Sequence, residues 1–226
     1  MQCTFYGHSA FGLNWNGTKL LFDPFISPNE AAKDVNINTI DADYIFLSHG
    51  HADHVADAEA IAKRTGATLV SNFEVVNWFA EKGISKNHPM NTGGSWTFPF
   101  GTVKCVHAVH SSAMPDGSYG GNPMGFVIHD NNQCIYFAGD TAFTMDMQLI
   151  PLYRKPDVCI LPVGGNFTMD IADAARAAEM VQCKKVVGVH FDTFGYIKID
   201  HQKAKTYFAD RGMELILPAI GETINI

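Results

Sequence analysis

Four side chains that can bind a metal ion lie within six consecutive residues. The segment HGHADH, residues 49–54, supplies His49, His51, Asp53 and His54. Imidazole nitrogens and carboxylate oxygens are ligands that zinc and similar divalent ions take from proteins. The apolar run before the segment, residues 44–47, is typical of a buried strand. A short loop after a rigid strand can turn several side chains toward one ion, so the segment predicts a metal site rather than a polar surface loop.

Three further polar side chains follow apolar, strand-like runs later in the chain. His110 closes the run 102–109, Asp140 follows the run 134–137, and His190 follows the run 185–189. The carboxyl ends of strands in one sheet system meet at one edge. We therefore expect these side chains to converge with the segment 49–54, which gives seven candidate ligands.

The elements that must position these side chains are short strands followed by strand–helix units. Asn16-Gly17 between two β-like runs predicts a hairpin, and Ser71-x-x-Glu74 has the spacing of a capping box for a helix that stops at Gly83. Strands are expected at residues 1–6, 10–15, 18–22, 43–47, 67–70, 95–98, 102–109, 125–129, 133–138, 158–161, 185–189, 214–217 and 223–226, and helices at 56–64, 171–182 and 201–211. We expect one domain, residues 1–226, of α/β class: a four-layer αββα sandwich with two mixed sheets face to face and helices outside.

Composition narrows the class of partner. The chain has 16 Lys and Arg against 23 Asp and Glu, a formal net charge of −7, and no basic cluster. Such a surface does not attract nucleic acid or an anionic membrane, so we expect a small-molecule substrate. Five cysteines without a CxxC pair, no leader-like start and no long apolar run favour a cytoplasmic protein. Formation of a homo-oligomer is left open.

The order and spacing of the candidate ligands resemble the five-motif signature of the metallo-β-lactamase superfamily. The signature consists of the segment 49–54, His110, Asp140 in the sequence AGDT, and His190, and the match extends along the whole chain. The segments GHS (7–9), DPF (23–25), GNFTM (165–169) and GET (221–223) are similar to those of small metal-dependent hydrolases in the L-ascorbate-6-phosphate lactonase-like branch.

The resemblance implies a centre with two metal ions. In it His49, His51 and His110 would hold one ion, Asp53, His54 and His190 would hold the other, and Asp140 would bridge them. No cysteine matches a ligand position, so zinc is expected, with manganese or iron as alternatives. A hydroxide that bridges the ions would attack the substrate, and Asp53 would orient it and carry a proton.

Three more residues are expected to support the centre. Asp23 follows the strand that ends at residue 22, and it is expected to fix the loop or a ligand imidazole, the alternative being a simple turn. His8 and Asn166 are expected to face the ligands or the substrate, and the alternatives are a core histidine and a connecting loop.

The predicted function is metal-dependent hydrolysis of an ester, lactone, thioester or phosphodiester bond in a small molecule. Two alternatives stay open. One is a non-haem iron oxidoreductase on the same scaffold, and the other is a metal-binding protein without catalysis.

Overall fold

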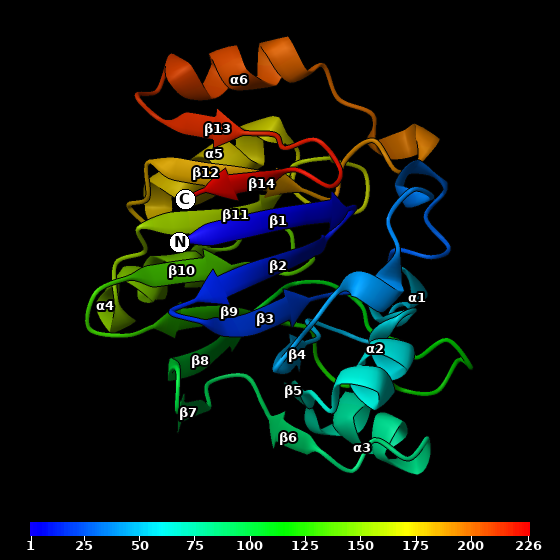
Figure 1. Ribbon diagram of the computed structural model, residues 1–226. Coiled ribbons are helices and arrows are strands. Elements are labelled where there is room, and N and C mark those ends of the chain that lie inside the picture. Colours follow the sequence, from blue (N-terminus) through cyan, green and yellow to red (C-terminus); the bar gives the residue numbers. More distant parts are fainter. The chain divides into compact units, whose positions relative to one another are not determined.

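A computed structural model describes all 226 residues, Met1–Ile226 (Figure 1). The chain divides into two compact units. The first unit comprises Met1–Thr92, Ser111–Pro123 and Ala219–Ile226, and the second comprises Gly93–His110 and Met124–Pro218. Each unit contains one seven-stranded sheet.

The sheet of the first unit has the strand order β14-β1-β2-β3-β4-β5-β6. Its strands are β1 (Gln2–Gly7), β2 (Ala10–Trp15), β3 (Thr18–Phe22), β4 (Tyr44–Phe46), β5 (Thr68–Asn72), β6 (Asn87–Met90) and β14 (Thr223–Asn225). β3, β4, β5 and β6 are parallel. β1 runs in the same direction, because β2 is antiparallel to both β1 and β3. The carboxyl ends of β1, β3, β4 and β5 therefore share one edge of this sheet, which we call the first edge.

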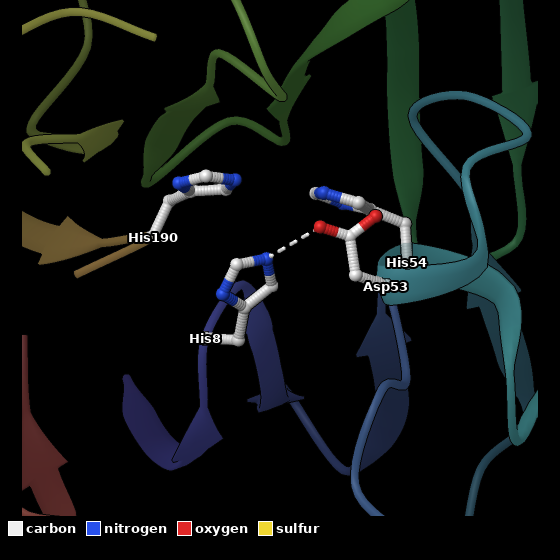
Figure 2. Close-up of side chains that lie close together, drawn as sticks. All are labelled: His8, Asp53, His54 and His190. Atoms are coloured by element: carbon white, nitrogen blue, oxygen red, sulfur yellow. Dashed lines mark hydrogen bonds and ion pairs between the residues drawn. The ribbon is translucent and has the colours of Figure 1, made fainter. Parts of the chain in front are cut away.

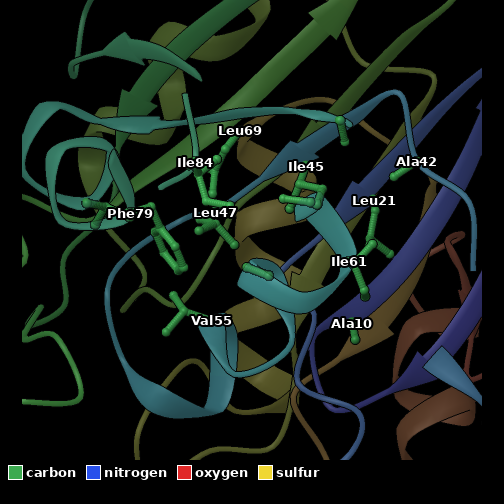
Figure 3. Packing of buried hydrophobic residues seen from close by; sticks show 14 of the residues in the cluster. Ala10, Leu21, Ala42, Ile45, Leu47, Val55, Ile61, Leu69, Phe79 and Ile84 are labelled. Atoms are coloured by element: carbon green, nitrogen blue, oxygen red, sulfur yellow. The ribbon is translucent and has the colours of Figure 1, made fainter. Parts of the chain in front are cut away.

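Helices of the first unit cover an apolar core. They are α1 (Ala52–Val55), α2 (Ala58–Thr65), α3 (Phe73–Glu81) and the 3-10 turns η1 (Glu30–Ala32) and η2 (Ile37–Thr39). Ile45 and Leu69 from the sheet pack with Ile61 of α2 and Phe79 of α3 in one buried cluster (Figure 3). Apolar side chains recur on one side of each helix and alternate in or out of the core on the strands, which is the pattern that buries them together.

The sheet of the second unit has the order β13-β12-β11-β10-β9-β8-β7. Its strands are β7 (Ser95–Phe98), β8 (Gly101–His107), β9 (Met124–His129), β10 (Cys134–Phe137), β11 (Val158–Pro162), β12 (Lys185–Val189) and β13 (Glu214–Ile216). β10 to β13 are parallel, and β9 is antiparallel to both β8 and β10. The carboxyl ends of β8, β10, β11 and β12 therefore share one edge, which we call the second edge. The unit also has η3 (Met145–Leu149), α4 (Ile150–Tyr153), α5 (Ile171–Met180), η4 (Gly195–Ile197) and α6 (His201–Ala209).

The expected fold class is confirmed: the chain is α/β, with two mixed sheets and helices. The hairpin at Asn16-Gly17 joins β2 and β3, whose bounds match the prediction. All five cysteines are buried and free, as their spacing indicates. No helix has the length and apolar character needed to cross a membrane. That residues 1–226 act as one domain stays a prediction.

Two predicted details of secondary structure are wrong. Ser71 does not cap α3: it lies in β5 and donates to Leu47 O, while Asn72 Oδ1 accepts from Val75 N and caps the helix. The helix expected at 56–64 is present as α2, Ala58–Thr65, and the one-turn helix α1 before it was not expected. β8 ends at His107, so that His110 lies in a loop and not at the end of a strand.

One strand has no sequence signal of its own. β6 carries Pro89 and pairs only with β5 at the margin of the sheet, where a missing N–H donor is tolerated.

Candidate metal centre

The segment 49–54 extends from the first edge into a one-turn helix. β4 ends at Phe46, two buried residues follow, and His49 is the next. α1 begins at Ala52, which places Asp53 and His54 in its only turn. The four candidate ligands of this segment are therefore fixed by a strand on one side and a helix on the other.

Asp23 organises the buried part of the first edge. It follows β3 and its carboxylate accepts from Ser48 N at 2.7 Å and from Ser48 Oγ at 2.6 Å. Its Oδ2 also lies 2.8 Å from Nδ1 of His54, and both side chains are fully buried. Burial raises the pKa of Asp23, whereas His54 and Ser48 act to lower it. Because Asp23 engages Nδ1, Nε2 is the nitrogen that His54 can offer to a metal.

His49 and His51 direct nitrogens at each other. Ser48 Oγ gives its proton to Asp23, so it can only accept from Nδ1–H of His49, 2.9 Å away. That bond leaves Nε2 as the unprotonated nitrogen of neutral His49, and Nδ1 of His51 lies 2.9 Å from it. Two ligands of one ion stand about 3 Å apart when each is about 2 Å from the ion, so the pair fits a shared cation.

His8 and Asp53 form the third contact of the first edge. His8 follows β1, and its Nε2 lies 3.2 Å from Oδ2 of Asp53 (Figure 2). The His8 side chain is fully buried, while that of Asp53 is 30% exposed. The ring of His8 also packs edge-on against that of His54, with 5.4 Å between centroids. His8 is thus placed to hold Asp53 in one orientation.

The loop Ser111–Pro123, which belongs to the first unit, packs on the backbone of the segment 49–54. Ser112 Oγ accepts from Gly50 N and donates to Gly120 O, and Ser111 Oγ lies 3.4 Å from Nε2 of His51. A Cβ at Gly50 would lie 3.2 Å from Ala113 O and 2.5 Å from the sulfur of Met114, so glycine allows this close approach.

The second edge carries the other three candidate ligands. Asp140 comes after β10 and His190 directly after β12, and Nε2 of His190 lies 3.0 Å from Oδ2 of Asp140. Nε2 of His110 lies 3.6 Å from the same oxygen. Asp140 and His190 are buried, each 2% exposed, whereas His110 is half-buried. The topology of the second sheet thus brings together three residues that are far apart in the sequence.

Hydrogen bonds of the backbone and of the Thr141 side chain tie the loops of the second edge to one another. Thr141 Oγ1 accepts from Val109 N at 2.9 Å, and Ala142 N donates to Val109 O. Thr141 O also accepts from Met169 N at 3.0 Å. Thr141 therefore joins the segment of His110, the segment of Asp140 and the loop after β11.

Several residues at the two edges have left-handed backbone conformations. His8, Asp23, Asn166 and His190 have φ between 39° and 56°. Non-glycine residues adopt such angles at a cost, and they cluster at functional sites. Three of these residues come directly after β1, β3 and β12, where the chain turns sharply as it leaves the sheet.

The side chains present fit a divalent transition metal. In the first unit, Nε2 of His49 and Nδ1 of His51 lie 2.9 Å apart, within the reach of one ion. The donors at both edges are imidazole nitrogens and carboxylate oxygens, which suit zinc, manganese or iron. None of the five buried cysteines belongs to the set.

The structure places every residue predicted for the site at one of the two edges. Asn166 lies there as well, in an exposed position on the loop after β11. Sequence reasoning missed Ser48, Thr141 and Ser112. Ser48 and Thr141 adjoin predicted ligands, and that adjacency is the signal that could have found them, whereas nothing in the sequence distinguishes Ser112.

Comparisons with known proteins agree with this geometry. Residues 2–190 match the family described as β-lactamase superfamily domain. A metal-dependent hydrolase of Flavobacterium johnsoniae is 54% identical over 226 residues, covering 100% of both chains. One from Christiangramia forsetii is 55% identical over 227 residues, again with 100% of both chains covered.

Solved structures show the same likeness. The structure of Igni18, a metallo hydrolase from Ignicoccus hospitalis, matches with a TM-score of 0.89 and 31% identity over 99% of this chain and 97% of that one. The chain therefore belongs to the family described as β-lactamase superfamily domain, and it is a metal-dependent hydrolase of the metallo-β-lactamase superfamily.

Proposed function

We propose that the protein binds two divalent metal ions, zinc first among them, and hydrolyses an ester, lactone, thioester or phosphodiester bond of a small molecule. The proposed ligands are His49, His51, Asp53, His54, His110, Asp140 and His190, with Asp140 as the bridge. The observation that carries the proposal is the pair of nitrogens on His49 and His51, 2.9 Å apart, beside the buried Asp23–His54 pair.

The chain's own residues have distinct tasks in this proposal. Asp23 fixes the ring of His54 through Nδ1, and Ser48 fixes the ring of His49 in the same way. His8 holds one oxygen of Asp53, so that the partly exposed carboxylate can orient a water and accept its proton. When bound, the metal ions would lower the pKa of a coordinated water and polarise the substrate oxygen.

The resemblance of the segments 7–9, 23–25, 165–169 and 221–223 to lactonase-like hydrolases supports a lactone or ester within this range. It does not transfer a particular substrate, because function resides in the site and not in the fold.

Metal content per chain tests the proposal. The protein is purified without chelators or a metal-affinity column, and metals are counted by mass spectrometry. We expect about two equivalents of one transition metal, and turnover of p-nitrophenyl acetate or bis(p-nitrophenyl) phosphate that chelation abolishes.

A matched pair of variants sharpens this test. His110→Ala is expected to lose about one equivalent of metal, whereas His107→Ala keeps both, because His107 is exposed and pairs with Asp146. One equivalent of iron with oxygen consumption would favour the oxidoreductase instead. No metal binding after reconstitution would contradict the proposed centre, and two metals without any hydrolysis would leave only a binding role.

A further inference from the structure

We propose that Phe167 and Tyr196 form an aromatic wall at the second edge, which binds an aromatic or other apolar group attached to a neutral ester, lactone or thioester. This inference rests on the proposed hydrolase function and narrows its substrate class.

The two aromatic side chains are large, exposed and adjacent. Phe167 is 50% exposed and Tyr196 is 79% exposed. Their ring centroids are 6.3 Å apart at an interplanar angle of 79°, which is an edge-to-face pair. Exposing so much aromatic surface is unfavourable in water, and a contiguous patch of it commonly marks a binding site.

Both rings stand on loops that begin at the second edge. Phe167 is on the loop after β11, and Met169 N of that loop donates to O of Thr141, the neighbour of Asp140. Tyr196 lies in η4, six residues after His190. The wall and two of the candidate ligands are therefore carried by connected backbone.

A glycine brings these two loops into direct contact. A Cβ at Gly164 would lie 2.1 Å from O of His190 and 2.9 Å from Cβ of Ile197. Any side chain at this position would separate the loop of Phe167 from the loop of Tyr196. Close packing at Gly164 therefore holds the loop of Phe167 against the loop that carries His190 and Tyr196.

The loop of Tyr196 is also closed on itself. Asp192 N donates to Ile197 O at 2.9 Å, and the Asp192 carboxylate accepts from Ile199 N at 3.0 Å and contacts Nε2 of His201 at 2.6 Å. A ring on such a loop is in place before a ligand arrives, so that binding loses little conformational entropy.

The charges at the second edge favour a neutral substrate. The segments that leave the strands there are residues 108–110, 138–149, 163–170 and 190–200, and Lys198 is the only Lys or Arg among them. Recognition of a phosphate group ordinarily uses Arg, Lys or a cluster of N–H donors. An aromatic pair without a cationic clamp instead suits an apolar group next to a neutral carbonyl.

Binding of an uncleaved analogue tests the wall without relying on catalysis. The affinities of 4-phenylbutyramide and acetamide are measured by saturation-transfer NMR on the wild type, on Phe167→Ala and on Tyr196→Ala. We expect the wild type to prefer the phenyl compound, and each variant to weaken its binding about ten-fold. Tyr153→Ala is the matched control, since Tyr153 is 48% exposed in the same unit but lies on α4.

Kinetics of the metal-loaded protein give the second measurement. For methyl 4-phenylbutyrate, both wall variants should raise KM about ten-fold with little change in kcat, while methyl acetate, which has no aromatic group, is unaffected; a pH indicator follows the released acid. Equal effects of the variants on the two esters would contradict the proposal that Phe167 and Tyr196 bind the apolar group. A wild type that does not prefer the phenyl amide would contradict it as well.

The outcomes separate this inference from the proposed function. Loss of phenyl binding in the variants without hydrolysis by any of them supports the wall and contradicts the hydrolytic role. Unchanged binding together with a shift of sedimentation coefficient in the variants would show that the rings join copies of the chain, and it would overturn the substrate wall.

Discussion

The two edges reach similar sets of donor atoms by different routes. At the first edge, four candidate ligands lie in six consecutive residues, and buried partners such as Asp23 and Ser48 fix their rings. At the second edge, three candidate ligands come from three separate loops, and contacts between those loops align them. The first edge therefore depends on side-chain hydrogen bonds, whereas the second depends on backbone packing.

The largest effect is expected from crowding the backbone of the second edge. In Gly164→Ala the new methyl group would meet O of His190, so we expect the free energy of unfolding to fall by about 3 kcal/mol. Gly50→Ala at the first edge should cost about 1 kcal/mol, because the flexible Met114 can move away. Urea unfolding of the metal-free protein measures both.

Gly195→Ala is the control for both glycine variants, since its added methyl group would meet no atom within 4 Å. It should unfold like the wild type. Equal losses for Gly50→Ala and Gly164→Ala would contradict the proposed difference between the edges.

The next effect concerns metal affinity at the first edge. Asp23→Ala removes the acceptor that orients His54, and we expect metal affinity to fall about 10- to 100-fold. Asp57→Ala is the matched control: this buried carboxylate accepts only from Ile26 N and Ser27 N. It should lower stability by about 1–3 kcal/mol and leave metal affinity unchanged.

Competition with a chelator measures the affinity of both aspartate variants. A loss of affinity in Asp57→Ala as large as that in Asp23→Ala would mean that general loosening of the loop, and not the orientation of His54, controls metal binding.

A smaller effect is expected from removing one hydroxyl group at each edge, that of Ser112 or that of Thr141. Ser112→Ala removes the bonds to Gly50 and Gly120, and Thr141→Val removes the bond to Val109. Each should cost about 1 kcal/mol of unfolding free energy. Amide hydrogen exchange should accelerate at Gly50 in the first variant and at Val109 in the second. Exchange that accelerates at both sites in either variant would show that the edges are not independent.

The smallest effect is a pH dependence at the loop Ser111–Pro123. Hydrogen bonds from Ser118 and Trp78 lower the pKa of Asp116 from 3.8 to about 2. Because the pKa is lower in the folded state, Asp116 stabilises the protein above about pH 4, and this contribution is lost as the pH falls from 4 toward 2. The difference in Tm between wild type and Asp116→Asn, measured with chelator present, should therefore shrink below pH 4. A constant difference would contradict the role of the charge.

The contrast between the edges also explains what the sequence could predict. The segment 49–54 is visible because its candidate ligands are contiguous, and the Asn16-Gly17 turn between two β-like runs marks where β2 ends and β3 begins. His110, Asp140 and His190 can be predicted only by assuming that several strands share an edge, which is a statement about topology and not about local pattern.

Other features have no local signal. β8 ends at His107 although apolar residues continue to Val109, because Val109 N bonds to Thr141 Oγ1 instead of a neighbouring strand. Ser71 has capping-box spacing, but tertiary pairing draws it into β5 and leaves the cap to Asn72. The contact between Gly164 and His190 joins residues from two loops and cannot be read from either one alone.

The last residues of the chain complete the first sheet. β14 pairs with β1, and the amino group of Met1 donates to O of Ile226 at 3.1 Å. During synthesis the first unit cannot gain β14 until the residues of the second unit have been made, although most of its own residues are made first. Since the two ends meet, a short linker could join them, and a circular permutant opened at an exposed turn such as Asn131-Asn132 should keep the fold.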